Sequence, residues 1–421
     1  MKVELAKSRK VQPRSQNYEL RKHYELPNHI LESIFRRLCS IDIFRAKASC
    51  PSWNSAAKSL LTSKSHICLS KTPWLVIHPK EFGQQKRGKI YNDNVDASVY
   101  IKNLEENMAY SLRLEFELNC CIGSSHGWLI VAGSEATPFL LNPFTLAAIQ
   151  LPPIIDFPLD VRIKKFAAYN VNSKSQLPEG FWVKAIMTSD PCANNNYSVI
   201  LIFARENLRR IAYSNNRDGS WSELDGKHAS YQDVICHGNQ LYALSSEGSI
   251  ETWDFQEGCP EKCMDIHLPF PKKSLDKEKS FEKDFIRTLY LVEMGGEILL
   301  VVRYACSHRR YGHSHPPVYE TQIFHVYKLN FSEKKWMEVK SLKDHSLFLG
   351  KNHSVSISTQ DSWSCKANSI YFVDDHVHLD TRNWNGYLDV GVYNMEDKSI
   401  GEIYERCTMD PPPCWLVPGP S

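Results

Sequence analysis

The stretch LPNHILESIFRRLCSIDIFRAKASCPSWNSAAKS, residues 26–59, decides how this chain is organised. Directly after Pro27, whose missing N–H is not needed in a first helical turn, apolar residues recur at the spacing of one helix face. Ser40 can cap a second helix, and Pro51 can begin a third. The stretch therefore predicts three short helices, and the apolar stripe of the first consists of Ile30, Leu31, Ile34, Phe35 and Leu38.

These three helices cannot hide their own apolar surface. Units below roughly 40 residues rarely hold a core without outside support, and the apolar residues here outnumber those that three short helices can shield. A partner surface is therefore expected. From the residues alone, that partner is either the rest of the chain, with the helices as an N-terminal cap, or another protein.

The helical stretch resembles an F-box, a motif that opens with Leu-Pro, continues with a Leu/Ile-rich helix and ends with Cys-x-x-Trp. The departures from the motif, Cys39-Ser40 and Pro51, remove no apolar contact position. The resemblance implies docking against a Skp-type adaptor, which bridges to a cullin–RING ubiquitin ligase. The adaptor-binding residues that it implies are Leu26, Pro27, Ile30, Leu31, Ile34, Phe35, Leu38, Asp42, Ile43, Arg45, Cys50 and Trp53.

From about residue 67 the pattern changes to short β-branched and aromatic runs between Gly, Asn, Asp and Pro turns. Many runs follow one another at the ~8–12-residue spacing of all-β folds. A unit typical of the outer hairpins of propeller blades also recurs: a strand ends at an asparagine turn, and the next strand carries a large apolar residue. The asparagines are Asn142, Asn215, Asn330 and Asn394, and the apolar residues are Trp221, Trp336 and Ile400. The predicted fold is mainly β, a three-helix F-box followed by a β-propeller-like domain of six or seven blades.

A second resemblance covers the β-rich region, which is similar to the C-terminal, kelch-like domain of KIB-like plant F-box proteins. The segments that carry it are GSSHGWLIV (123–131), PFLLNPFT (138–145), SIYFVDD (369–375), DVGVYNMED (389–397) and PPPCWLVP (411–418). The expected domains are a basic disordered tail at 1–23, the F-box at 24–65 and a substrate-recognition propeller at 66–421. The implied function is that of a non-catalytic subunit of a Skp–cullin–F-box E3 ubiquitin ligase, which recruits a target protein for ubiquitination and degradation.

Two other functions stay open at this point. One is a propeller enzyme or small-ligand binder whose helical start caps the fold, and the other is an F-box scaffold that acts outside a ligase. The composition favours neither, since 42% hydrophobic and 23% charged residues are ordinary values for a globular protein. A formal net charge of +2 gives no support to a nucleic-acid or membrane partner.

The sequence also bears on location. The first 25 residues contain no apolar segment, so no secretory signal is expected, and no apolar run reaches the roughly 18 residues of a membrane helix. The cytoplasm, the nucleus or both are predicted, and the thirteen cysteines are expected to be reduced. A nuclear-import role for the basic tail stays open; its cations are Lys7, Arg9, Lys10 and Arg14.

Three segments contain residue types that carry chemistry. Residues 83–89 resemble a phosphate-binding loop, but Ile90 stands where a magnesium-binding hydroxyl is needed, so a solvated basic hairpin is expected. The first His cluster, which fits no common zinc spacing, is Cys306, His308, His313 and His315. The second, expected to be a structural turn, is Asp374, Asp375, His376, His378 and Asp380. We therefore expect no catalytic residue, no metal and no cofactor.

The end of the chain predicts how a propeller would close. Trp415 lies six residues from the last residue, among prolines that stiffen its approach. A large apolar side chain at such a position is expected to be buried rather than left in water. We therefore expect Trp415 to pack against the strand around Trp74, which would lock the last blade to the first.

Overall fold

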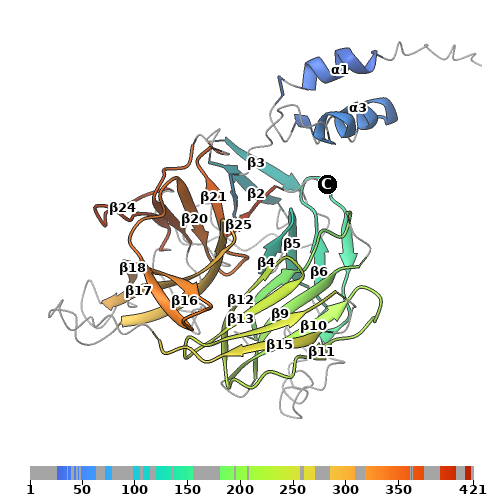
Figure 1. Ribbon diagram of the computed structural model, residues 1–421. Helices are drawn as coiled ribbons and strands as arrows, with labels where there is room; N and C mark the ends of the chain where they lie inside the picture. The colour runs from blue at the N-terminus through green and yellow to red at the C-terminus, as the bar shows by residue number, and fades with distance from the viewer. Residues whose placement is uncertain are drawn as a thin grey trace, which may run out of the picture. The chain divides into compact units, whose positions relative to one another are not determined.

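Figure 1 shows a computed structural model of the chain, which divides into two compact units, Met1–Ile67 and Cys68–Ser421. The structure describes residues 26–35, 37–38, 42–43, 46, 49–62, 72–77, 98–104, 108–113, 120–133, 137–154, 181–193, 196–205, 208–256, 260–270, 285–308, 318–360, 362, 364–373, 389–403 and 413–418. Outside them lie the basic tail, the loop at 83–89, the cluster at 374–380, and Arg45, His313 and His315.

The first unit contains helices α1 (Asn28–Phe35) and α3 (Pro51–Thr62). The carbonyl of Pro27 accepts bonds from the N–H groups of Ile30 and Leu31, at 2.9 and 3.1 Å, so the chain turns into α1 directly at this proline. Pro51 begins α3 as the sequence predicts, and residues 42, 43 and 46 of the middle segment are helical as well. No helix in the described part of the chain is both long and apolar enough to cross a membrane.

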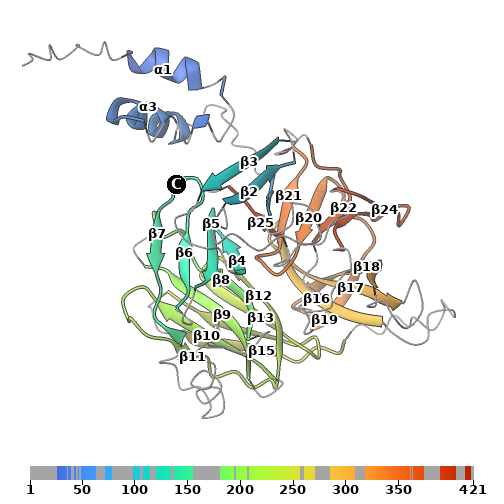
Figure 2. The same cartoon turned by 180° about the vertical axis from the view of Figure 1, so that it is seen from behind.

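The described residues of the second unit form five sheets that follow one another around a common centre, as Figures 1 and 2 show from opposite sides. In strand order, the first sheet is β25 (Cys414–Leu416), β1 (Trp74–Ile77), β2 (Ser98–Asn103) and β3 (Met108–Arg113). The third is β12 (Tyr231–His237), β13 (Gln240–Ser245), β14 (Ile250–Asp254) and β15 (Glu261–Ile266). The fourth is β16 (Phe285–Met294), β17 (Glu297–His308), β18 (Val318–Asn330) and β19 (Lys335–Val339).

The second sheet joins two antiparallel groups of four strands. One group is β4 (Cys120–Ser125), β5 (Trp128–Ala132), β6 (Phe139–Leu141) and β7 (Ala148–Gln150); the other is β8 (Trp182–Met187), β9 (Ser198–Arg205), β10 (Leu208–Asn215) and β11 (Ser222–Glu223). A parallel pairing of Gly123 with Ala185 connects them. A Cβ at Gly123 would lie 1.9 Å from the Ala185 carbonyl oxygen, so this close approach requires glycine.

The fifth sheet has the order β21 (Val355–Ser358), β20 (His345–Leu349), β22 (Ser369–Phe372), β23 (Gly391–Asn394) and β24 (Ile400–Gly401). Here β20 and β22 run parallel, whereas the other neighbours are antiparallel. The apolar cores of the ring lie between successive sheets: Ile235 and Leu244 of the third sheet cluster with Leu291 and Leu300 of the fourth. Side chains of one sheet therefore pack face to face with those of the next, as in a propeller.

The predicted closure of the ring is confirmed. The last strand, β25, pairs antiparallel with β1, and Leu75 lies opposite Trp415. Trp415 is fully buried, and its ring meets that of Phe348 edge to face with centroids 5.1 Å apart. Its indole N–H donates to the carbonyl of Leu349 at 3.0 Å, so the chain end is tied to the fifth sheet as well as to the first.

The side chain of Asn352 completes this closure. Its amide nitrogen donates to the carbonyl oxygen of Trp415 at 2.8 Å, and its amide oxygen accepts the N–H of Trp415 at 3.2 Å. One buried amide thus satisfies both backbone polar groups of a residue in the closing strand, as a neighbouring strand would. Nothing in the local pattern around Asn352 indicates a partner 63 residues away, so this role is not predictable from the sequence.

The recurrent asparagine turns are also confirmed. The side-chain oxygen of Asn142 accepts the N–H of Phe144 at 3.0 Å, and the equivalent bonds from Asn215, Asn330 and Asn394 reach residues two or three positions on. Four residues after each asparagine the backbone is left-handed, with φ of +58°, +62°, +46° and +61° at Leu146, Gly219, Lys334 and Lys398. The same asparagine-led turn is therefore used at four outer hairpins.

The tryptophans after these turns tie neighbouring strand groups together, whereas Ile400 does not. The indole N–H of Trp221 donates to the carbonyl of Pro152 at 2.8 Å, and that of Trp336 donates to the carbonyl of Gly248 at 2.9 Å. Each bond joins the strand group of the tryptophan to the preceding one. Ile400 has no side-chain donor and is 44% exposed, so the last unit of the series lacks the equivalent bond.

We expect Trp336→Phe to lower the free energy of unfolding by about 1–3 kcal/mol, because the buried carbonyl of Gly248 loses its donor. Urea unfolding followed by circular dichroism would measure the change. The exposed neighbour Met337→Leu is the matched control and should shift stability by less than about 0.5 kcal/mol. Equal stability of the two variants would show that the bond does not hold the sheets together.

Candidate functional site

The helical unit has a core of its own. Leu31 and Phe35 of α1 pack with Ile43 and with Ala56 and Ala57 of α3, and all five are fully buried. The ring of Phe35 meets that of Trp53 edge to face, with centroids 5.5 Å apart. Three residues that the F-box resemblance assigns to adaptor binding, Leu31, Phe35 and Ile43, thus contribute no surface in this structure.

An exposed apolar edge lies at the start of α1 and in the two residues before it. Leu26 and Ile30 are 42% and 40% exposed, and Pro27 between them is exposed too. We call these three residues the Leu26/Ile30 edge. Ile34 and Leu38 are half-buried and pack against the core, so an apolar band runs from the core to the surface along α1.

The other predicted adaptor-binding residues lie nearby. Asp42, Cys50 and Trp53 are half-buried, and the carbonyl of Cys50 accepts the N–H of Asn54 at 2.9 Å at the start of α3. The hydroxyl of Ser59 donates to Glu32 at 3.1 Å and links α3 to α1. This link was not predicted, because a hydroxyl and a carboxylate on polar helix faces carry no signal of a contact 27 residues apart.

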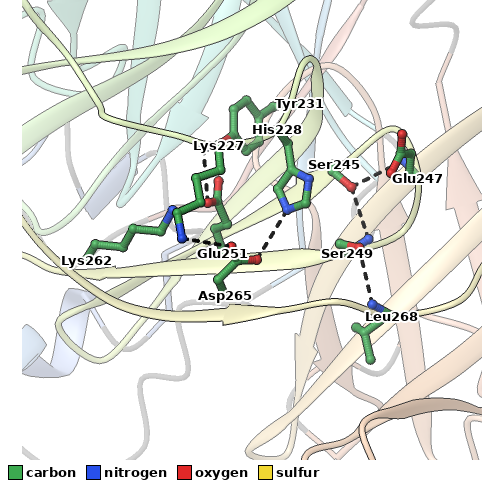
Figure 3. A network of polar contacts seen from close by, with 10 residues as sticks. All are labelled: Lys227, His228, Tyr231, Ser245, Glu247, Ser249, Glu251, Lys262, Asp265 and Leu268. Atoms are coloured by element: carbon green, nitrogen blue, oxygen red, sulfur yellow. Dashed lines mark hydrogen bonds and ion pairs between the residues drawn. The ribbon is translucent and has the colours of Figure 1, made fainter.

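A polar network in the third sheet was also not predicted (Figure 3). Its centre is Glu251 of β14, which is fully buried. The carboxylate accepts a bond from the hydroxyl of Tyr231, pairs with the ammonium of Lys262 and accepts the N–H of Lys227 at 3.2 Å. Burial first, and then the bond to Glu251, raise the pKa of Tyr231, so this phenol remains a protonated donor.

The network contains residue types that bind metals. Ligand atoms of His228, Glu251 and Asp265 lie within 4.8 Å of one another, and His228 Nε2 is 3.5 Å from a carboxylate oxygen of Asp265. However, the ammonium of Lys262 contacts Glu251, and that of Lys227 lies 3.8 Å from Asp265. Two lysines already compensate the two carboxylates, so a divalent cation would have to displace them, and we assign no metal here.

Comparison with known protein families supplies the decisive observation. Residues 24–64 match the model of the F-box domain, and residues 100–394 match the model of the KIB1-4 beta-propeller. The chain belongs to the KIB1-4 β-propeller family of F-box proteins. The predicted plant F-box family with a C-terminal propeller is thereby confirmed, as is a mainly β fold behind a helical F-box region.

This F-box protein is similar to several from Arabidopsis thaliana. It is 25% identical to F-box protein KIB2 over 391 residues, which cover 90% of this chain and 79% of KIB2. It is 23% identical to F-box only protein 7, with 93% of each chain covered. Among solved structures, the N-terminal domain of Nup159 matches at 10% identity with a TM-score of 0.32, covering 74% and 73% of the two chains; a score this low carries no argument.

The inner strands of the propeller contain a buried ion pair. The ammonium of Lys184 on β8 contacts the carboxylate of Asp233 on β12, and both side chains are buried. Asp233 also accepts the N–H groups of Val234 and Leu291, at 2.7 and 2.8 Å. Because Leu291 lies on β16, one carboxylate connects three neighbouring strand groups, and its bonds are structural rather than available for catalysis.

His353, just after β20, is a further ionisable residue of the propeller. Burial lowers its pKa to about 3, and the positive charge of Lys184 and the nearby His126 act in the same direction. Because the folded-state pKa lies below the unfolded value of about 6.5, only the unfolded chain binds a proton here between pH 6.5 and 3. The stabilising contribution of neutral His353 is therefore complete above pH 6.5 and is lost as the pH falls through that window.

Below pH 6.5, we expect the free energy of unfolding to fall by up to about 1.4 kcal/mol for each unit by which the pH is lowered. The His353→Asn variant should show a shallower dependence of this free energy on pH. The value is an upper limit, since His353 retains some exposed surface. Urea unfolding at pH 7, 6 and 5 would measure it. The exposed His237→Asn is the control and should keep the slope of the unchanged chain, whereas equal slopes for all three proteins would contradict the assignment.

Proposed function

We propose that this F-box protein is the substrate-recognition subunit of a Skp–cullin–F-box ubiquitin ligase. An F-box implies a Skp1-type adaptor as partner, and proteins with this domain pair are typically non-catalytic adaptors. The observation that carries the proposal is the Leu26/Ile30 edge, an apolar surface beside a helical core that is already packed. The protein would accelerate ubiquitin transfer by holding the target near the reactive subunits, with no catalytic residue of its own.

The adaptor-binding residues divide into two sets in this proposal. Leu26, Pro27 and Ile30 contact the adaptor directly, and the half-buried Ile34 and Leu38 continue the contact surface. The buried residues hold α1 and α3 in the shape that presents this edge; they are Leu31, Phe35 and Ile43. Burial of apolar surface at the edge supplies the main driving force. We also propose that the adaptor contacts Asp42, Arg45, Cys50 and Trp53.

The propeller is the proposed receptor for the target protein. We infer six blades, because the second sheet separates into two antiparallel groups of four strands at the single pairing of Gly123 with Ala185. In this division the F-box covers residues 24–65 and the propeller residues 66–421. The proposed compartments are the cytoplasm, the nucleus or both.

A capture experiment tests this function. The full chain and its Ile30→Asp variant are expressed with the proteasome and cullin activation blocked, and bound proteins are identified. A target should be captured by both chains through the propeller, whereas the Skp-type adaptor should be captured only by the unchanged chain. In cells without these blocks, the target should carry fewer ubiquitin chains and rise in abundance when the variant replaces the unchanged chain. A target whose abundance and ubiquitination are the same with both chains would favour a scaffold outside a ligase.

A further inference from the structure

Two buried cysteines meet where the propeller ring closes. Cys121 lies on β4 and Cys414 on the closing strand β25, and both are almost fully buried. The thiol of Cys414 donates to the sulfur of Cys121 at 3.0 Å, and the thiol of Cys121 donates to the carbonyl oxygen of Gly123 at 3.2 Å. Both sulfurs are thiols in this structure, and 293 residues separate them in sequence.

The backbones around this pair are already held side by side. The hydroxyl of Ser124, three residues after Cys121, donates to the carbonyl of Trp415, the residue after Cys414. Cys414 itself lies opposite Val76 in the pairing of β25 with β1. A disulfide bond has a length of about 2.05 Å, so the sulfurs need to approach by about 1 Å.

We propose that Cys121 and Cys414 are a redox-sensitive latch: a hydroperoxide converts the two thiols into a disulfide that closes the propeller ring covalently. One thiol is first oxidised by hydrogen peroxide to a sulfenic acid, with release of one water. The sulfur of the second cysteine then attacks the sulfenic sulfur, and hydroxide leaves as a second water after taking up the thiol proton. Two thiols and one peroxide thus give one disulfide and two waters.

The latch strengthens the closure of the ring. In the reduced protein, β25 is joined to β1 by three paired residues and to the fifth sheet by Asn352 and Trp415. A strand of only three residues has few backbone bonds to break and opens locally more easily than the longer strands, and such opening admits a peroxide to the thiols. A bond across a closed loop of 293 residues restricts the unfolded chain strongly and prevents β25 from leaving.

The test uses the full chain, treated with hydrogen peroxide or kept reduced. Digestion without reducing agent, followed by mass spectrometry, should yield one peptide pair joined through Cys121 and Cys414. The midpoint of thermal unfolding should rise by at least about 5 °C in the oxidised protein. Oxidation of the exposed Cys192 and Cys263 without the Cys121–Cys414 link would overturn the proposal, as would a link that leaves the midpoint unchanged.

Three variants separate the latch from general oxidation. Cys414→Ser should abolish both the linked peptide and the rise in midpoint, and its midpoint in the reduced state shows whether the variant folds. Cys263→Ser, a change at an exposed cysteine of β15, should retain both. Asn352→Ala removes the amide that holds Trp415 and should increase the rate of linkage severalfold, since β25 opens more often. An unchanged rate would show that opening of β25 does not admit the peroxide.

Discussion

The full chain with Ile30→Asp is expected to lose capture by a Skp-type adaptor, with an affinity at least about 100-fold lower. Ile30 is 40% exposed in the free chain, so the new carboxylate is hydrated until the adaptor covers it. Burying an unpaired carboxylate in an apolar interface costs several kcal/mol, and each 1.4 kcal/mol is about a tenfold change in affinity. Leu26→Ala with Pro27→Ala should weaken capture in the same direction by removing apolar contact area.

The control for this prediction lies on the propeller. Leu208 is also 40% exposed, and Leu208→Asp places the same charge on a comparable surface, so adaptor capture should be unchanged. Binding is measured with purified adaptor by titration calorimetry, and helix content by circular dichroism. Undiminished capture of the Ile30→Asp chain would refute the proposed contact. Phe35→Ala should also abolish capture, but for a different reason: it removes a buried ring and should unfold the helical unit, with a loss of helix content that Ile30→Asp does not show.

Trp415→Ala is expected to destabilise the propeller by about 3–5 kcal/mol, the usual loss for a buried tryptophan. The change removes a fully buried side chain, its edge-to-face contact with Phe348 and its bond to the carbonyl of Leu349. Truncation after Asp410 should cost at least as much, since it also removes the pairing of β25 with β1. Denaturant unfolding gives the free energy, and limited proteolysis reports the loosened ring.

Adaptor binding provides the internal control for this second prediction. The helical unit is a separate compact unit, so the Trp415→Ala chain should still bind the adaptor with unchanged affinity while losing its target. Val417→Ala, at a half-buried position outside β25, should change stability by less than about 1 kcal/mol. A Trp415→Ala propeller as resistant to protease as the unchanged one would show that the ring does not depend on this closure.

Several features of the fold follow from local sequence. The stripe after Pro27 predicts α1, because apolar residues at helical spacing need one buried face. The asparagines predict the outer turns, because a short amide side chain can bond backbone N–H groups a few residues on. The buried position of Trp415 beside β1 was also predictable, because so large an apolar side chain is rarely left in water. In each case the physical cause acts within a few residues or on one side chain.

Other features depend on the tertiary structure. Spacing places Leu31 and Ile30 in one stripe, but only the packing of α1 on α3 decides that Leu31 is core and Ile30 is surface. The pair Lys184–Asp233, the clamp of Asn352 on Trp415 and the contact of Cys121 with Cys414 are likewise absent from any local pattern. Their partners are 49 to 293 residues apart, and they meet only when the sheets pack against one another around the ring. A side chain's type limits what it can bind, but for these long-range contacts the packing of the sheets decides which group it meets.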